Sequence, residues 1–320
     1  MPCAYAPGAA PRRRRLLRLG AAFCITAGVA ATSTGCARQE SARRALSIAV
    51  IPKGTSHEFW KSVHAGAVKA SRELSSADLA VNVVWKGPIR EDDREQQVQV
   101  VEGFLSQGVD GIVLAPLDDR ALVRPVVEAR RAGIAVVIVD SALASTEIVS
   151  FVATDNYKGG QLAADRLGAL LHGAGTARLL RYQEGSASTT EREQGFLDRM
   201  KASFPGVPIV SSDQYAGPTR DTAKRASENL LNRYGGDLSG VFCANESSCV
   251  GMLLALQDAG KAGTIAFVGF DASEPLVTDL SCKGSSSTVG RTRARFTSLL
   301  SSTSRGSRVK STTTSRFGRL

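Results

Sequence analysis

Short apolar runs rich in β-branched residues alternate along the chain with longer segments of helical periodicity. The apolar runs, typical of strands buried on both faces, are residues 46–51, 81–85, 111–115, 135–139, 149–153, 176–181, 207–211, 240–243 and 266–269. The helical segments between them are residues 58–74, 92–106, 120–132, 156–172, 190–204, 221–234 and 247–260. Regular alternation of strand and helix predicts parallel sheets covered by helices on both faces.

This rhythm predicts an α/β fold of two doubly wound parallel-sheet lobes joined by a hinge. We place the N-terminal lobe at residues 46–142 and the C-terminal lobe at 143–270, with 271–280 returning to the N-terminal lobe. In such sheets ligands bind outside the carboxyl ends of the strands. The residues that directly follow each strand are therefore the candidates for function.

Aromatic and polar side chains gather at these strand ends. Phe59 and Trp60 come after the first strand, Asp140 and Asp271 follow later strands, and Arg192 lies after the sixth. Taken singly, each has an ordinary alternative: Phe59 as core, the aspartates as turn caps, Arg192 as a surface ion pair. Together they predict a site for a small polar molecule with a stacking face. Asp155 is better explained as a helix cap.

Composition narrows the class of protein. Of 320 residues, 43% are hydrophobic and 22% charged, which is ordinary for a globular protein and excludes a polytopic membrane protein, a coiled coil or a mostly disordered chain. The formal net charge of +10 resides at the two ends, because residues 1–44 carry +7, residues 281–320 carry +9 and the body between them is acidic. We therefore expect no nucleic-acid partner.

The N-terminal end has the pattern of an export signal. An arginine run at residues 12–15 is followed by an apolar stretch too short to span a membrane, and then by small residues up to Cys36. The sequence S-T-G-C resembles a bacterial lipobox, although Ser33 stands where leucine is usual. We expect residues 1–35 to be a lipoprotein signal peptide, Cys36 to be lipidated and 36–45 to be a tether. Ordinary cleavage nearby is the alternative.

Neither a catalytic nor a metal centre is predicted. No nucleophile elbow, phosphate-binding loop or dinucleotide fingerprint is present, and Lys53 with Gly54 is explained as a turn. His57 and His64 share one helical face without a carboxylate to complete a metal site. Cys243 and Cys249 form either a disulfide or two buried thiols. We expect no enzyme activity and no cofactor.

Seven stretches, in order and spacing, resemble one family: the sugar-type periplasmic binding proteins of ABC importers, related to the ribose- and galactose-binding proteins and to the LacI effector domain. They are HEFWKSVHAGAVKASREL, GVDGIVLAPLD, AGIAVVIVDS, ATDNYKGGQLAADRL, EREQGF, GVFCANESSCVGMLLALQDAGK and IAFVGFDASEPL. The resemblance implies a monomeric, exported protein that captures a sugar or polyol by hinge closure and presents it to a membrane permease. A ligand sensor in a signalling system is the alternative.

The resemblance also implies a set of ligand-binding residues. Phe59 and Trp60 match the aromatic pair that sandwiches the sugar, because an aromatic ring buries the apolar C–H face of a pyranose. The polar residues that match the family's ligand-binding positions are Asp140, Arg192, Asn245 and Asp271. Two further ligand-binding positions, His57 and Ser141, differ from the family. Ser141 stands where ribose-binding relatives have arginine and His57 where they have asparagine, so altered specificity is expected.

Residues 281–320 do not match the family. They contain eleven Ser, seven Thr, nine basic residues and no acid, where the family has a return strand, a helix and a glutamine that contacts the sugar. Our hypothesis is an out-of-frame C-terminus, from a genuine frameshift or a sequencing error, which translation of the other two reading frames past codon 280 would test. A basic tail that binds anionic envelope polymers is the alternative.

Overall fold

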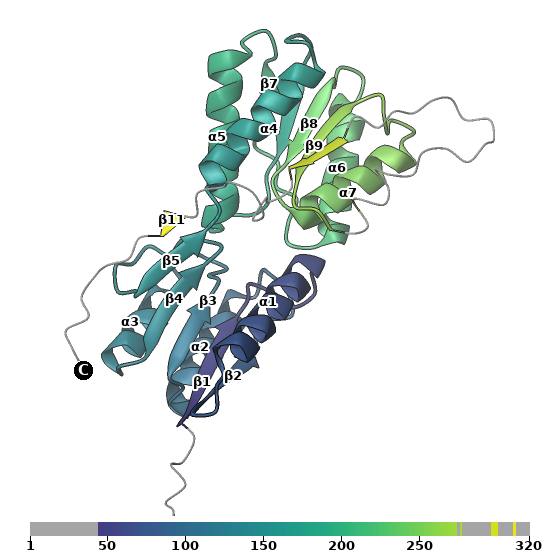
Figure 1. Cartoon of the computed structure of the whole chain (residues 1–320). Helices are drawn as coiled ribbons and strands as arrows, with labels where there is room; N and C mark the ends of the chain where they lie inside the picture. The colour runs from purple at the N-terminus through teal and green to yellow at the C-terminus, as the bar shows by residue number, and fades with distance from the viewer. Residues whose placement is uncertain (1–43, 274–275, 277–295, 300–309, 312–320) are drawn as a thin grey trace, which may run out of the picture. The chain divides into compact units, whose positions relative to one another are not determined.

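A computed structural model describes residues 44–273, 276, 296–299 and 310–311. This part of the chain forms two β-sheets with helices packed against them (Figure 1). We refer to the described residues built on each sheet as the first and second lobe.

The first sheet is built as the apolar runs predict. Its strands are β1 (Arg44–Ile51), β2 (Leu79–Trp85), β3 (Gly111–Leu114), β4 (Ala135–Val139), β5 (Ser150–Ala153) and β11 (Lys310–Ser311). They lie in the order β11-β5-β4-β3-β1-β2, and every pairing is parallel except β11 with β5.

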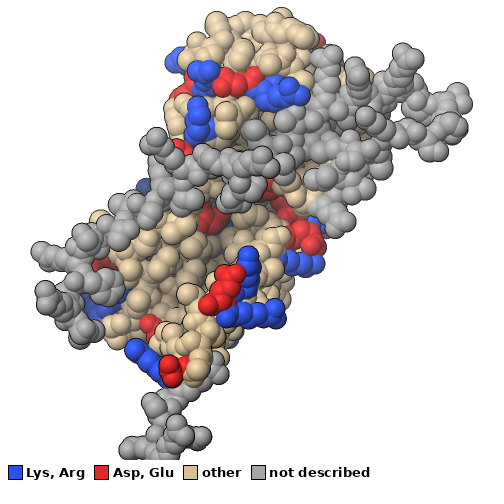
Figure 2. All heavy atoms as spheres, in the orientation of Figure 1, with Lys and Arg blue, Asp and Glu red and all other residues tan. Residues whose placement is uncertain are grey.

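Helices α1 (Glu58–Leu74), α2 (Arg94–Gln107) and α3 (Val123–Arg131) belong to this lobe. A buried core including Phe104, Val126 and Ile138 joins α2 and α3 to one face of the sheet. On the opposite face Val139 and Val152 are paired neighbours, and Val152 is 40% exposed. Figure 2 shows charged side chains over α1, whereas much of the surface beside them, over β3 to β5, is uncharged.

The boundary between the lobes differs from the sequence prediction. We placed residues 143–270 in the C-terminal lobe, yet β5 pairs with β4 as a member of the first sheet, with Ile138 opposite Phe151. The chain thus enters the second sheet only after Ala153. The apolar side of β5 completes the first core, where Phe151 packs.

The second sheet is entirely parallel and has helices on both faces. Its strands are β6 (Ala177–Leu180), β7 (Ile209–Ser211), β8 (Gly240–Cys243), β9 (Ala266–Phe270) and β10 (Phe296–Leu299), in the order β10-β9-β8-β6-β7. The helices are α4 (Asn156–Leu170), α5 (Ala187–Ser203), α6 (Arg220–Tyr234) and α7 (Glu246–Asp258). One core includes Leu167, Phe196 and Phe242, and another includes Leu230, Val241 and Met252. The predicted α/β fold is confirmed.

Two glycines allow α4 and α5 to approach closely. A Cβ atom on Gly160 would lie 1.9 Å from the carbonyl oxygen of Arg192, and one on Gly195 would lie 2.0 Å from that of Tyr157. No side chain fits at either position, so the backbones touch. This contact fixes the first half of α5, which carries Arg192.

The tail contains more structure than its composition suggests. The sequence offered no element after residue 280, but β10 extends the second sheet beside β9 and β11 pairs with β5. Cys36, Cys282 and the signal segment lie outside the described residues. Cys243 and Cys249 are free thiols, and burial raises the pKa of both. Among the helices described, none is both long and apolar enough to cross a membrane.

Candidate ligand-binding site

Side chains from the carboxyl ends of both sheets meet around one small cavity. It is lined by Lys53, His57, Phe59, Trp60, Glu91, Asp140, Tyr182, Ser188, Thr189, Arg192, Asn245, Glu246 and Asp271. Its volume of about 30 Å³ is the space of about one water molecule. A monosaccharide is larger, so its entry requires the residues that meet across the cavity to separate.

The first turn of α1 supplies the aromatic wall. The rings of Phe59 and Trp60 meet edge to face, with centroids 4.9 Å apart and planes at 78°. Trp60 is 3% exposed, and its indole Nε1 donates to Glu91 Oε1 at 2.6 Å. The backbone N–H of Phe59 donates to Glu246 Oε2 of the second lobe at 3.1 Å. The aromatic pair is thus held by polar contacts at its edges, while its rings border the cavity.

Glu91, in the loop after β2, is the acceptor at the centre of this wall. Besides Trp60, its carboxylate accepts from His57 Nδ1 at 2.8 Å and from the Tyr182 hydroxyl at 2.5 Å. Burial alone would raise the pKa of Glu91, but the hydrogen bond and charge of His57, with help from Lys53 and Tyr182, lower it to about 2. Burial opposes the charge on His57, yet Glu91 outweighs it and raises the pKa of His57. The two side chains form a buried ion pair.

Two aspartates at strand ends adopt left-handed backbone conformations. Asp140, after β4, has φ 63°, and Asp271, after β9, has φ 68°. Residues with a Cβ atom rarely adopt this region, and such strain gathers at functional sites. Asp140 Oδ2 lies 3.2 Å from Lys53 Nζ, and Asp271 Oδ2 accepts the backbone N–H of Glu246 at 3.0 Å. Burial raises the pKa of Asp271, although the charge of Arg192 opposes this.

Arg192 is a buried part of the site. Its Nε donates to Asn156 Oδ1 at 2.8 Å and one terminal nitrogen donates to the carbonyl oxygen of Ala244 at 2.9 Å. The guanidinium stacks 3.8 Å from the ring centroid of Phe270, and it lies 3.9 Å from Asp271 Oδ2. These contacts leave the side chain little freedom, so Arg192 presents a fixed donor to the cavity.

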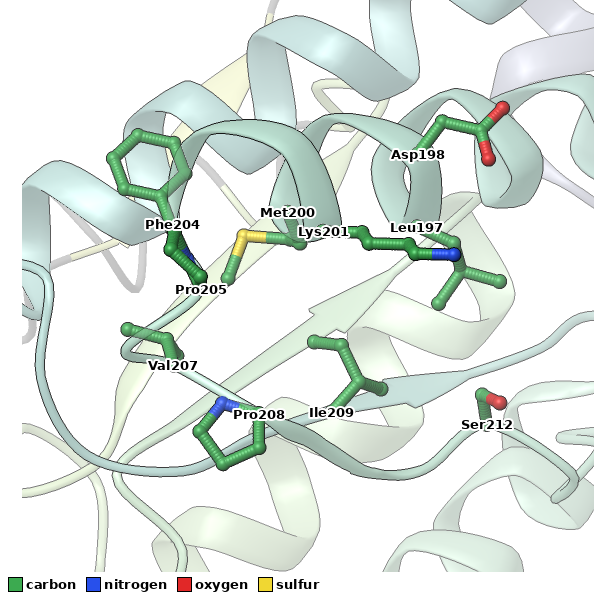
Figure 3. A pocket seen from close by; sticks show the side chains of 10 residues that line it. All are labelled: Leu197, Asp198, Met200, Lys201, Phe204, Pro205, Val207, Pro208, Ile209 and Ser212. Carbon is green, nitrogen blue, oxygen red and sulfur yellow. The ribbon is translucent and has the colours of Figure 1, made fainter.

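A larger hollow lies elsewhere on the second lobe and lacks this chemistry. It has a volume of about 470 Å³ and lies beside the end of α5 and the segment leading into β7. Figure 3 shows apolar side chains that include Phe204, Val207 and Ile209, with Asp198 and Lys201 on the preceding turns of α5. Because no set of polar groups converges there, the small cavity between the strand ends is the better candidate. Among the residues described, no group of three or more His, Cys, Asp or Glu side chains could hold a metal ion.

Comparison with known proteins identifies the family. The model of the periplasmic binding protein domain matches residues 48–290. This chain belongs to the periplasmic binding protein family. The match of the family model extends to residue 290, beyond residue 280, where the sequence analysis placed the end of the resemblance.

Several binding proteins of sugars are similar to this chain. The D-ribose/D-allose-binding protein of Pseudomonas aeruginosa is 32% identical over 244 residues, which span 72% of this chain and 73% of that protein. A solute-binding protein of an ABC transporter from Agrobacterium vitis, solved with bound D-fucose, is 35% identical with a TM-score of 0.68 over 73% of this chain and 79% of its own. A periplasmic component of a sugar transport system from Hahella chejuensis is 34% identical with a TM-score of 0.68, over 73% and 83% of the two chains. Membership of this family indicates the periplasm or cell envelope as the location.

Within this periplasmic binding protein, the structure brings together nearly all the residues that the sequence singled out. His57, Phe59, Trp60, Asp140, Arg192, Asn245 and Asp271 line the cavity. Ser141 does not: it is fully buried, and its hydroxyl accepts the backbone N–H of Ser188 at 3.0 Å. Asp155 accepts from the backbone N–H of Lys158, as expected of a helix cap. Asn245 both lines the cavity and caps α7.

Sequence reasoning missed the rest of the lining, chiefly Lys53, Glu91, Tyr182 and Glu246. The turn at Lys53 is not solvated, because the Lys53 side chain is only 4% exposed and donates to Ser186 and Ser188 of the second lobe. Lys53, Tyr182 and Glu246 all follow predicted strands, so the strand-end rule includes them, but the family resemblance assigned them no ligand role. Glu91 lies in the polar segment R-E-D-D-R-E, where nothing distinguishes a buried acid from solvated ones.

Proposed function

We propose that this protein captures a neutral monosaccharide or related polyol between its two lobes and presents it to an ABC permease, without catalysis. The observation that carries this is the shared cavity: an aromatic pair from the first lobe faces fixed hydrogen-bonding groups from both lobes. Relatives that bind ribose, allose and fucose support solute capture over the signalling alternative. In this proposal Asp140, Asp271 and Asn245 partner hydroxyls, and Arg192 donates to a ring or hydroxyl oxygen.

The charge pairing of the cleft favours an uncharged ligand. Each of the four acids facing the cavity has a basic neighbour: Asp140 has Lys53, Glu91 has His57, Glu246 has Arg220 and Asp271 has Arg192. A charged ligand would bring an unbalanced charge into this buried site, which costs several kcal/mol. A sugar with hydroxyls alone brings none.

Calorimetric titration of the purified chain with pentoses, hexoses and inositols tests the proposal. We expect at least one neutral compound to bind in a 1:1 ratio, and its uronic acid and amino-sugar counterparts to bind at least about 100-fold more weakly. Tighter binding of the uronic acid would mean that Lys53 and Arg192 bind an anionic ligand. Absence of binding across the neutral panel would count against sugar capture itself.

We further propose that the mature protein is a monomer tethered to the membrane by a lipid on Cys36. The support is the signal-like pattern of residues 1–35 and the S-T-G-C sequence that ends it. Labelling cells with a radioactive fatty acid should mark the protein, and Cys36→Ser should abolish the label and release the protein from the membrane fraction. Label that persists in Cys36→Ser would rule out this attachment site.

A further inference from the structure

Lys53 joins the two lobes through hydrogen bonds of its ammonium group. It follows β1 in the first lobe, and 3% of the residue is exposed. Its Nζ donates to Ser186 Oγ at 3.2 Å and to Ser188 Oγ at 3.0 Å, both at the start of α5 in the second lobe. The third partner is Asp140 Oδ2 at 3.2 Å in its own lobe. Of the three N–H donors of the ammonium, two therefore bind hydroxyls of the second lobe, and Asp140 balances the charge.

The Ser186 hydroxyl binds Lys53 and does not cap its own helix. It stands at the N-cap of α5, where a serine hydroxyl ordinarily accepts a backbone N–H of its own first turn. Here the Ser186 side chain makes no such capping bond, although it is fully buried. Ser186 does not line the cavity, whereas Ser188 does. The hydroxyl of Ser186 therefore serves Lys53 and does not face the ligand.

We propose that Lys53, Ser186 and Ser188 form an interlobe clasp that holds the cleft shut around the ligand and sets how slowly it leaves. The clasp rests on the proposed capture of a sugar between the lobes. When the lobes part, Lys53 exchanges two hydroxyl partners for water and stays paired with Asp140. Lys53 is thus a positioning residue: it keeps Asp140 in place and ties it to the second lobe in the closed state only.

Stopped-flow binding of the neutral sugar found by calorimetry tests the clasp through Ser186→Ala. We expect the dissociation rate to rise about three- to ten-fold, with the association rate within about two-fold of the wild type, because one hydrogen bond of the closed state is lost. The matched control is Ser227→Ala, since Ser227 is equally buried but bonds only locally, to the carbonyl oxygen of Ala223 at 2.7 Å. It should leave both rates unchanged.

A second variant separates the clasp from a local effect on α5. Lys53→Met should raise the dissociation rate at least as much, and Ser186→Ala should have no further effect in that background. Equal effects of Ser186→Ala with and without Lys53 would overturn the proposal, as would an unchanged dissociation rate in Lys53→Met.

A ligand-free measurement keeps the clasp testable apart from sugar capture. Small-angle X-ray scattering without sugar should give a larger radius of gyration for Lys53→Met than for the wild type. An unchanged radius would contradict the clasp whether or not a sugar binds. Sugar binding by the wild type with normal rates in every clasp variant would reject the clasp and leave the proposed function standing.

Discussion

Replacing Trp60 with leucine is expected to weaken sugar binding by about 100-fold, a loss of about 2.7 kcal/mol. Leucine keeps apolar volume in the core but removes the flat face against which a sugar ring stacks, together with the indole N–H that Glu91 accepts. Calorimetry of Trp60→Leu with the sugar that binds the wild type measures the change.

Trp85→Leu provides the matched control. Trp85 lies in β2 of the same lobe, stacked on His64 with ring centroids 4.6 Å apart, and does not line the cavity. This variant should keep the wild-type affinity within about two-fold, even where it lowers stability. Equal losses of affinity in the two variants would mean that Trp60 acts through folding and not through contact with the ligand.

Glu91→Gln is expected to lower the free energy of unfolding by about 3 kcal/mol and to weaken sugar binding as well. The amide cannot balance the buried charge of His57, and its NH₂ group faces a donor at either oxygen position, Trp60 at one and Tyr182 at the other. Chemical denaturation at pH 7 measures the stability. Glu58→Gln is the control, because Glu58 is exposed and pairs only with Lys61 across one helical turn. It should change stability by less than about 0.5 kcal/mol.

The loss caused by Glu91→Gln should depend on pH. The pKa of Glu91 is lowered to about 2, so its charge stabilises the folded wild type above the ordinary value of 4.5, and this contribution fades as the pH falls towards 2. The stability difference between wild type and variant should therefore shrink between pH 5 and pH 3. A difference that stays constant over this range would show that the Glu91 charge contributes nothing to folding.

The sequence predicted the elements of the fold better than their grouping into lobes. The helix predicted at residues 58–74 and the strand predicted at 240–243 both have the predicted bounds in the structure. Apolar periodicity reports directly on burial, which is why these elements could be predicted. Apolar periodicity could not show to which sheet β5 belongs. Its run S-F-V-A suits either sheet, and only the pairing of Phe151 with Ile138 decides between them.

The candidate site divides in a similar way. Phe59, Trp60, Asp140 and Asp271 follow strands, and parallel topology carries the strand ends of each sheet to one edge, so their gathering at these edges was predictable. Glu91 and Lys53 owe their roles to partners far along the chain, such as Tyr182 and Ser186. Local sequence contains no sign of such partners, and both side chains would ordinarily be expected in solvent.

The fluorescence of Trp60 during sugar titration tests the central claim most directly. The chain has two tryptophans, so Trp85→Phe leaves Trp60 as the single reporter. We predict that a neutral sugar bound in calorimetry changes the emission of Trp60 saturably and with the same Kd. A sugar that binds this variant without altering that emission would contradict a ligand site against the aromatic pair.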